Sequence, residues 1–511
     1  MWFAAIGLLM FVVSALMHPL MVWTGPQSVQ FRPPSFSFEP QQAQQKLAEG
    51  LKQLSNLDKS SISVAKMVPT AQGAMLQVTG ETGARRYYPL SGEQRDYSDK
   101  QQALWLAQYY TGEAREIDSL LYVEDFSVEY PSVNRLLPVF KVVYEGDDHL
   151  SVFVHTETNA LASINNDWKR GLQSLFQWLH TWSWLDSVPE LRVFIVAALM
   201  LSLLLMSIAG VLLLLLFKRR LYSRKSIAIH RFIAWSVFLP LTGLLFSGLY
   251  HLLHGALVGD AVESRLLSIS SSQVSSSQSL RSTVNKSAGN EQTISTLASA
   301  INASNILQSL QGQSINSLSL LSVGGEWVLR ASIAHQPRSA GAGNDQHSHH
   351  SIDDLKATMK LRNQRFDGRS SEKGARFYSL EGQQRLPLSD PQVVESLARQ
   401  WLALPHSQKL TLSLVTHFGP NYDFRNKRLP VWQVDVGAEA GDRLFIDPVS
   451  GLLVDHQRLQ GQWERWSFSN LHKWNPLVPL IGREGRDLVA VLVLLLIGAL
   501  GWFGVRMRQP R

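Results

Sequence analysis

The hydrophobic residues of the chain gather in four long blocks that are separated by much more polar sequence. The blocks cover residues 1–23, 191–217, 227–258 and 488–505. Each approaches or exceeds the roughly 20 apolar residues that a helix needs to cross a bilayer. The first block lacks the basic flank and small-residue cleavage site of a signal peptide, so we expect it to remain as a helix. The pattern therefore predicts a membrane α-helical protein with a four-span bundle.

The polar sequence between the blocks contains short runs that are typical of strands. They are rich in β-branched and aromatic residues and are bounded by turn residues. Before them, Ser98-Asp99 and Ser389-Asp390 occupy the position of a helix N-cap. One helix packed on a small antiparallel sheet is an α+β module, and we expect two such modules in each half. The four clearest strand runs are residues 139–144, 150–154, 431–436 and 443–446.

The two halves of the chain repeat one another. Leu137-Pro138 to His180 aligns without a gap on Leu429-Pro430 to His472, an interval of 43 residues in both. The repeat extends upstream, where Gly83-Ala84-Arg85 recurs as Gly374-Ala375-Arg376, and into the spans, where Ser14 to His18 matches Ser247 to His251. We therefore expect an internal duplication of a whole half-protein. Matched pairs are Phe176, Leu179, His180, Trp182 and Leu185 with Phe468, Leu471, His472, Trp474 and Leu477.

Charge predicts the orientation of the spans. The loop between the second and third spans carries five basic residues at 218–225, and the C-terminal tail carries three more at 506–511. Short basic flanks stay on the cytoplasmic side, so both termini are expected inside and both long segments outside. The same flanks largely explain the net charge of +7, so we do not expect nucleic-acid binding.

The expected domain organisation follows from these features. Spans are placed at 1–24, 191–217, 227–258 and 488–505, with a cytoplasmic loop at 218–226 and a cytoplasmic tail at 506–511. Exported α+β regions are placed at 25–172 and 259–464, and amphipathic segments lying in the membrane interface at 173–190 and 465–487.

Composition removes several kinds of chemistry. The chain has no cysteine, which excludes disulfides, thiol catalysis, iron–sulfur ligation and covalent c-type haem. Residues 268–287 are rich in serine and are expected to form a linker. A polar loop holds His347, His349 and His350. A surface tract is favoured over a separate metal site there, because no carboxylate or cysteine has a recognised ligand spacing.

The exported regions resemble the PepSY module, through the Leu-Pro start, the second strand and the turn at Thr158-Asn159 or Ser450-Gly451. The order and duplication of these parts are similar to the PepSY-associated transmembrane-helix family over nearly the whole chain. The resemblance implies a bacterial inner membrane protein with periplasmic PepSY-like regions. Related proteins include haem-containing ferric-siderophore reductases, so it also implies electron transfer from a cytoplasmic or quinol donor to a periplasmic iron chelate.

Four histidines occupy matched positions near the outer face, His18 with His180 and His251 with His472. Ionisable groups in or near a membrane usually mark functional sites, and neutral imidazole is a standard axial ligand of haem iron. We therefore expect haem b, one or two per chain, with outer ligands drawn from these four; which pairs with which is left open. The alternative is that they are interfacial residues hydrogen-bonded to backbone or lipid.

Two further histidines are weaker candidates. His254 shares a helix face with His251 and competes with it for the outer site. His230 lies 21 residues before His251, about 30 Å along a helix, where a second haem near the cytoplasmic face would sit. The first-half copy of His230 would fall four residues before Met1, so a segment upstream of the present start would have to supply it.

The sequence thus predicts an inner-membrane b-type haem electron-transfer protein that reduces a periplasmic ferric chelate such as a siderophore. The alternative is a non-enzymatic PepSY membrane protein that binds or regulates a periplasmic partner such as a peptidase. A transporter subunit is a third alternative, which the lack of carboxylates in the four blocks disfavours. No Rossmann glycine pattern or flavin domain is recognisable, so a nucleotide donor would bind elsewhere.

Overall fold

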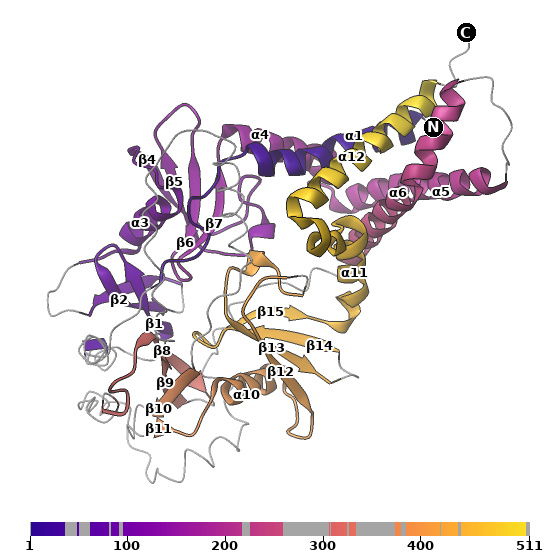
Figure 1. Cartoon of the computed structure of the whole chain (residues 1–511). Helices are drawn as coiled ribbons and strands as arrows, with labels where there is room; N and C mark the ends of the chain where they lie inside the picture. Colours follow the sequence, from indigo (N-terminus) through magenta and orange to yellow (C-terminus); the bar gives the residue numbers. More distant parts are fainter. Residues whose placement is uncertain are drawn as a thin grey trace. The chain divides into compact units, whose positions relative to one another are not determined.

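The chain divides into two compact units in the computed structural model (Figure 1). A helical unit contains residues 1–26, 165–261 and 458–511, and a sheet unit contains residues 27–164 and 262–457. The serine-rich stretch, the histidines at 347–350, most of the basic loop and the tail lie outside the described residues. The structure describes residues 2–35, 49–50, 62–80, 83–90, 96–216, 225–258, 306, 308–323, 326–333, 374–379, 385–419, 421–437 and 441–506.

The helical unit is built on four long helices. They are α1 (Trp2–Thr24), α5 (Pro189–Leu216), α6 (Lys225–Val258) and α12 (Val478–Arg506). All four are long and apolar enough to cross a membrane, which confirms the predicted spans. A helix satisfies its own backbone hydrogen bonds, which is why it can enter a bilayer. Within the unit, α1 packs on α5 and α12, and α6 packs on the same two helices (Figure 1).

Helix α12 begins earlier than the hydrophobic pattern indicated. It starts at Val478 and contains a kink at Gly482, whose φ of 73° departs from helical geometry. Its first turns carry Glu484, Arg486 and Asp487, which a search for apolar residues excludes. These charged residues precede the apolar block at 488–505, which itself contains no carboxylate.

A short irregular segment precedes the second and the fourth long helices, α5 and α12. The two segments are organised in the same way. Helix α4 (Asp167–Phe176) runs into a π-helical turn, η3 (Gln177–Thr181), and then η4 (Ser183–Leu185). In the second half, η10 (Leu459–Gly461) and α11 (Gln462–Ser467) lead into the π-helical turn η11 (Phe468–His472) and then η12 (Asn475–Leu477). Trp182 and Trp474 follow the π turns with left-handed backbones, φ 54° and 51°. These residues redirect the chain toward α5 and α12.

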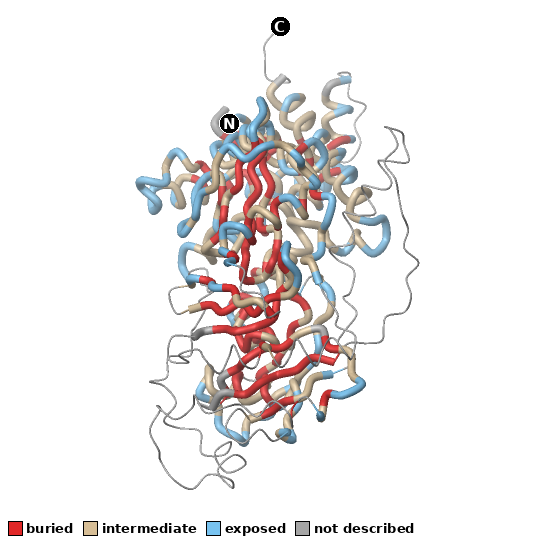
Figure 2. The backbone as a smooth tube through the Cα atoms, turned by 90° about the vertical axis from the view of Figure 1, so that its left-hand side faces the viewer, coloured by how far each residue is buried: buried red, intermediate tan, exposed pale blue. Residues whose placement is uncertain are grey.

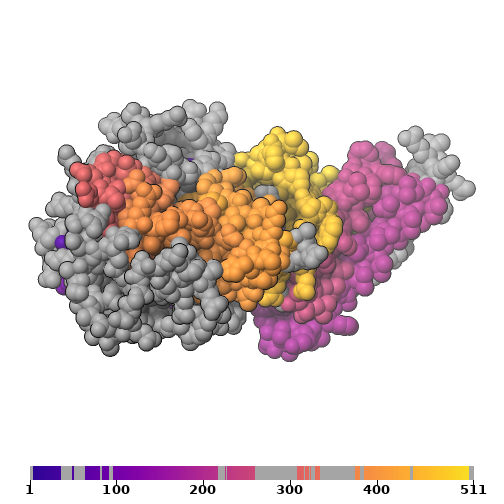
Figure 3. All heavy atoms as spheres, turned by 90° about the horizontal axis from the view of Figure 1, so that it is seen from below, coloured from indigo at the N-terminus to yellow at the C-terminus, as the bar shows by residue number. Residues whose placement is uncertain are grey.

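The sheet unit contains two antiparallel four-stranded sheets of the same order. One is β4 (Ile117–Val123), β5 (Val139–Tyr144), β6 (Ser151–His155) and β7 (Ala160–Asn165). The other is β12 (Leu410–Val415), β13 (Val431–Val436), β14 (Asp442–Ile446) and β15 (Leu453–Gln457). The predicted strand runs are confirmed, with shifts of about one residue at their ends. Figure 3 shows the second half of this unit, in orange, as a continuous surface.

One helix covers each four-stranded sheet. Helix α3 (Asp99–Thr111) begins after Ser98, and α10 (Asp390–Leu402) begins after Ser389. Both serines form a capping box with a glutamine three residues later, which confirms the predicted N-caps. The apolar faces of the helices join the sheets in two buried clusters. Burial of this apolar surface is what holds helix and sheet together.

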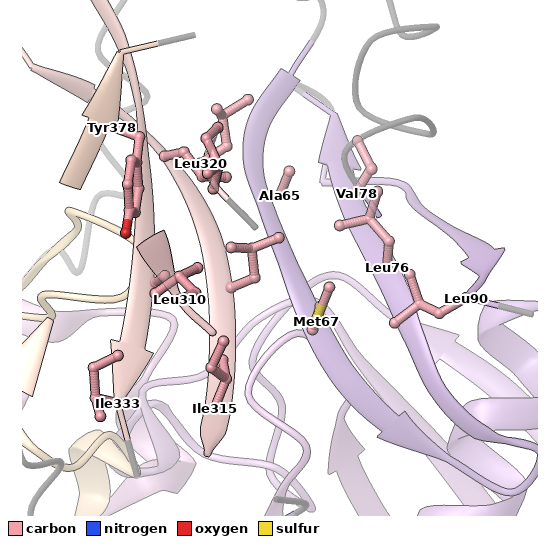
Figure 4. Close-up of a cluster of buried hydrophobic side chains, with 14 residues drawn as sticks. Ala65, Met67, Leu76, Val78, Leu90, Leu310, Ile315, Leu320, Ile333 and Tyr378 are labelled. Atoms are coloured by element: carbon pink, nitrogen blue, oxygen red, sulfur yellow. The ribbon is translucent and has the colours of Figure 1, made fainter. Parts of the chain in front are cut away.

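A third sheet joins the two halves, in the order β11-β10-β9-β8-β1-β2-β3. Its strands are β1 (Ile62–Thr70), β2 (Gly73–Gly80), β3 (Arg85–Pro89), β8 (Ile315–Val323), β9 (Glu326–Ile333), β10 (Gly374–Ser379) and β11 (Arg385–Leu386). At its centre β1 pairs antiparallel with β8, so that Ala65 lies opposite Leu320. Both contribute to the core cluster in Figure 4. The halves therefore share one sheet instead of forming two separate modules each, because pairing β1 with β8 removes two exposed edges.

Buried charges also join the halves inside the sheet unit. Glu157 of the first half is ion-paired with Arg428 of the second half and, at 2.7 Å, with Lys66. Burial opposes ionisation of Glu157, but the two cations outweigh it and hold the pKa of the carboxyl well below its usual range. Arg428 also reaches Asp447 at 3.1 Å. Lys66, Glu157 and Asp447 are buried, so these charges depend on one another for stabilisation. Figure 2 draws the buried residues of the chain in red.

Candidate functional site: a histidine cluster in the helical unit

The two π-helical turns each place one histidine against the long helices. His180 is the penultimate residue of η3 and packs against α1, and His472 is the last residue of η11 and packs against α6. Each imidazole stacks on the phenylalanine four residues earlier, with ring centres 4.8 Å apart for Phe176 and 4.7 Å apart for Phe468. A π turn adds a residue to the helical repeat, and such turns are frequent at functional sites. Here the turn and the stacked ring restrict the orientation of each imidazole.

Two buried serines determine which ring nitrogen carries the proton. Ser14 Oγ lies 2.9 Å from His180 Nδ1, and Ser247 Oγ lies 3.2 Å from His472 Nδ1. Each hydroxyl donates its own hydrogen to the carbonyl three residues earlier in its helix, at 2.9 Å for Ser14 and 3.2 Å for Ser247. A hydroxyl has only one hydrogen to donate, so it accepts from the imidazole Nδ1–H. The lone pair of each histidine is therefore on Nε2.

The two imidazoles face one another across the helical unit. Their ring centres are 6.4 Å apart and their planes are inclined at 76°. Two imidazoles that bind one metal ion from opposite sides, through nitrogen bonds of about 2.0–2.1 Å, have ring centres about 6.4 Å apart. The separation between the ring centres of His180 and His472 is therefore compatible with two imidazoles that would hold one metal ion between them.

Protonation would prevent metal binding, and the surroundings of both rings disfavour it. Burial, with a contribution from His18, lowers the pKa of His180 to about 4. Burial and the neighbouring His180 and His251 lower the pKa of His472 to about 3. Both imidazoles are therefore neutral near pH 7, which is the form that ligates iron.

The other two outer histidines flank this pair. His18 lies one helical turn after Ser14 on α1, is exposed, and is close enough to His180 to affect it electrostatically. His251 lies one turn after Ser247 on α6, and its side chain is 49% exposed. Its Nδ1 is 2.5 Å from the buried carboxylate of Glu464. The structure thus brings the four predicted outer histidines into one cluster, with His180 and His472 at its centre.

His251 is also oriented by an aromatic ring. It stacks on Phe468, with ring centres 4.2 Å apart and planes inclined at 22°. Phe468 therefore contacts both His251 and His472. A carboxylate on Nδ1 is the usual means of orienting a histidine whose Nε2 has a function. The first half has no such carboxylate, because the residue that aligns with Glu464 is Leu172.

The two weaker candidates lie outside this arrangement. His254 sits on α6 with its ring centre 6.1 Å from that of Tyr250, and its Nε2 is buried without a hydrogen-bond partner in the described part of the chain. His230, near the start of α6, hydrogen-bonds the backbone of Leu500 on α12, while its Nδ1 is buried without a partner among the same residues. A Cβ on Gly504 would lie 3.6 Å from the His230 ring. The His230 ring therefore lies close to α12 at Gly504, where a residue with a side chain would contact it.

Sequence reasoning gave no role to Ser14, Ser247 or Glu464. The two serines do stand at matched positions, one helical turn before His18 and His251. The repeat was therefore the signal that could have identified them. No comparable signal exists for Glu464, because its partner in the repeat is apolar.

A haem and a simple metal ion would make different demands on the side chains of this site. No three histidine, cysteine, aspartate or glutamate side chains in the described ranges gather in a way that could hold a metal. A haem needs only two from the protein, because its porphyrin supplies the other four ligands. Two neutral imidazoles in the observed arrangement meet that requirement.

Neither a protein-family model nor a curated protein matches the sequence of the chain. We therefore infer its function from the residues and their geometry.

Proposed function

We propose that this chain is an inner-membrane electron-transfer protein that binds haem b between His180 and His472 and reduces a periplasmic ferric chelate. The observation that carries the proposal is the paired, neutral imidazoles whose ring centres are 6.4 Å apart. Ordinary packing does not require two matched histidines to converge from two π turns, each with its Nδ1 on a buried serine. Four histidines clustered between helices are typical of a bundle that holds a cofactor.

The residues around the proposed site act by orientation and by exclusion of water. Ser14 and Ser247 hold the Nδ1–H of each imidazole and leave Nε2 for the iron. Phe176 and Phe468 cover one face of each ring and limit its rotation. A haem with two histidine ligands supplies one-electron transfer, and the protein sets its position and surroundings. A ferric chelate would receive the electron at the outer face.

The resemblance to the PepSY-associated transmembrane-helix family supports the same proposal. The halves match in the order of their four-stranded sheets, the capping boxes, the π turns and the left-handed tryptophans. A buried tyrosine also bonds a backbone carbonyl six residues later in both halves, Tyr130 at 2.7 Å and Tyr422 at 3.0 Å. These matches favour an internal duplication. The basic flanks favour a periplasmic location for the sheet unit.

A reduced-minus-oxidised spectrum of the purified full-length chain, with a haem-to-protein ratio, tests the proposal. We expect a Soret band and α bands, and their loss in His180→Ala and in His472→Ala. His417→Ala, on an exposed loop of the sheet unit, is the control that leaves the spectrum unchanged. A colourless preparation from haem-sufficient cells would refute the proposal, as would an unaltered spectrum in both variants. Reduction of a ferric chelate by the dithionite-reduced protein then tests the acceptor.

The second candidate is a protein that binds a periplasmic partner without redox chemistry. One observation favours it, an exposed apolar strand at the edge of the first four-stranded sheet. Substitutions distinguish the two candidate functions. Substitutions at the histidines would abolish the first function and leave the second intact, whereas substitutions on the strand would have the opposite effect.

A further inference from the structure

Strand β4 lies at the edge of its sheet (Figure 1). It exposes several large apolar side chains. It pairs with β5 on one side, and no described strand pairs with its other side. Leu121 is 51% exposed and Tyr122 44% exposed. Exposed apolar residues continue past the strand at Phe126, Val128 and Val133. An edge strand with unpaired backbone groups and exposed apolar side chains is a template for the addition of another strand.

The same surface carries uncompensated negative charge. Glu116 and Asp118 lie at the start of β4, and Glu124 and Asp125 follow its end. All four are exposed, and none forms an ion pair with another residue in the part of the chain that the structure describes. The nearby Arg115 does not offset them, because it is paired with Glu113 and Asp148. A partner that approaches this edge therefore meets a negative field.

The corresponding edge in the second half, β12, lacks the acidic residues and exposes only one large apolar side chain among its described residues, Leu414 at 42%. In the alignment of the halves, Leu121 corresponds to Ser413 and Asp118 corresponds to Leu410. Around β12, Lys409 is exposed and no acidic residue occurs between 404 and 422. The two sheets have the same strand order, so the apolar and acidic edge is not a consequence of the fold. It is a property of the first half alone.

We propose that β4 is a docking site for an extended, basic segment of a partner protein, which adds as a strand to the open edge. The main-chain groups of β4 would supply hydrogen bonds, and the exposed apolar side chains would contact alternate residues of the segment. The four carboxylates would select lysine and arginine. A second copy of this chain fits less well, because pairing β4 with β4 would bring like charges together. The proposal is independent of the haem site.

Synthetic strand-forming peptides test the proposal on the full-length protein in detergent micelles. The probe is a peptide of alternating lysine and valine, and the control peptide alternates glutamate and valine. We expect the basic peptide to bind, to slow hydrogen exchange of the outward-facing amides of β4, and to weaken as salt is raised. The exchange of β12 amides should not change.

Two variants separate the contributions of apolar contact and of charge to peptide binding. Leu121→Ser gives β4 the residue of β12, and we expect about tenfold weaker binding from the loss of one buried leucine. Asp118→Lys should weaken binding further and reduce its salt dependence. Thr411→Lys on β12 is the matched control and should change nothing. Because these side chains are exposed, none of the substitutions should unfold the protein.

Three results would overturn the proposal. The first is equal binding of the glutamate peptide, which would remove the role of charge. The second is equal protection of β12, which would show attachment to any open edge. The third is protection of β4 that rises with protein concentration alone, which would identify a second copy of the chain as the occupant.

Discussion

Removal of the serine hydroxyls at the histidine site should weaken the proposed haem binding. Ser14→Ala deletes the hydroxyl that accepts the His180 Nδ1–H, and Ser14 has no exposed surface through which water could replace it. A buried donor left without a partner costs about 1–3 kcal/mol. Loss of a group that orients a metal-bound histidine lowers affinity by about 10–100-fold. The range of free energy and the range of affinity agree, since each tenfold change in affinity is about 1.4 kcal/mol.

The two halves should respond unequally. The bond from His180 to Ser14 is 2.9 Å long, whereas that from His472 to Ser247 is 3.2 Å. We therefore expect Ser14→Ala to lower the haem-to-protein ratio and the haem affinity more than Ser247→Ala does. The double variant should lose the most.

Haem titration of the depleted protein, followed at the Soret band, measures this effect. Ser202→Ala is the matched control, because Ser202 is a serine of α5 that bonds the carbonyl three residues earlier and contacts no histidine. Thermal unfolding of the depleted protein gives a second readout that does not need haem. Equal haem affinity in Ser14→Ala, Ser202→Ala and the unaltered chain would refute the assigned role of the hydroxyl.

Three further predictions concern the sheet unit, each measured by chemical unfolding of the full-length protein in micelles. Glu157→Ala should destabilise it by about 3–5 kcal/mol, because the paired cations stay buried, while Asp118→Ala should change it by less than about 0.5 kcal/mol; equal effects would contradict the buried network. Burial and, as a smaller cause, nearby cations hold the pKa of His155 well below 6.5 in the folded protein. As the pH falls, the unfolded chain therefore takes up a proton on this histidine before the folded protein does. Stability should therefore fall by about 1.4 kcal/mol per pH unit below about 6.5, and His155→Gln should remove this slope. Tyr130→Phe and Tyr422→Phe should each cost about 1–3 kcal/mol by leaving a carbonyl unpaired, and a clear inequality would argue against equivalent roles.

Much of the fold followed from local sequence. The spans were recognisable because a membrane helix needs a long apolar run, and the capping serines because a helix start needs side-chain acceptors. The strands at 139–144 and 431–436 were recognisable by their β-branched and aromatic residues. The pairing of β1 with β8 was not, because it joins residues far apart in the sequence and depends on which edges meet. The start of α12 was missed since its charged first turns break the apolar run.

The sequence by itself determined which histidines are matched, because the repeat is a property of residue order. It also determined that they lie beside apolar spans. It could not decide which of them lie next to one another, because the turns η3 and η11 pack on different helices, α1 and α6, whose own packing sets the distance between the two imidazoles. Only the tertiary structure brought His180 next to His472. It also placed Ser14, Ser247 and Glu464 within hydrogen-bond distance of the histidine ring nitrogens. Such contacts arise between residues more than 150 positions apart, where helix packing decides the distance and local propensity has no influence.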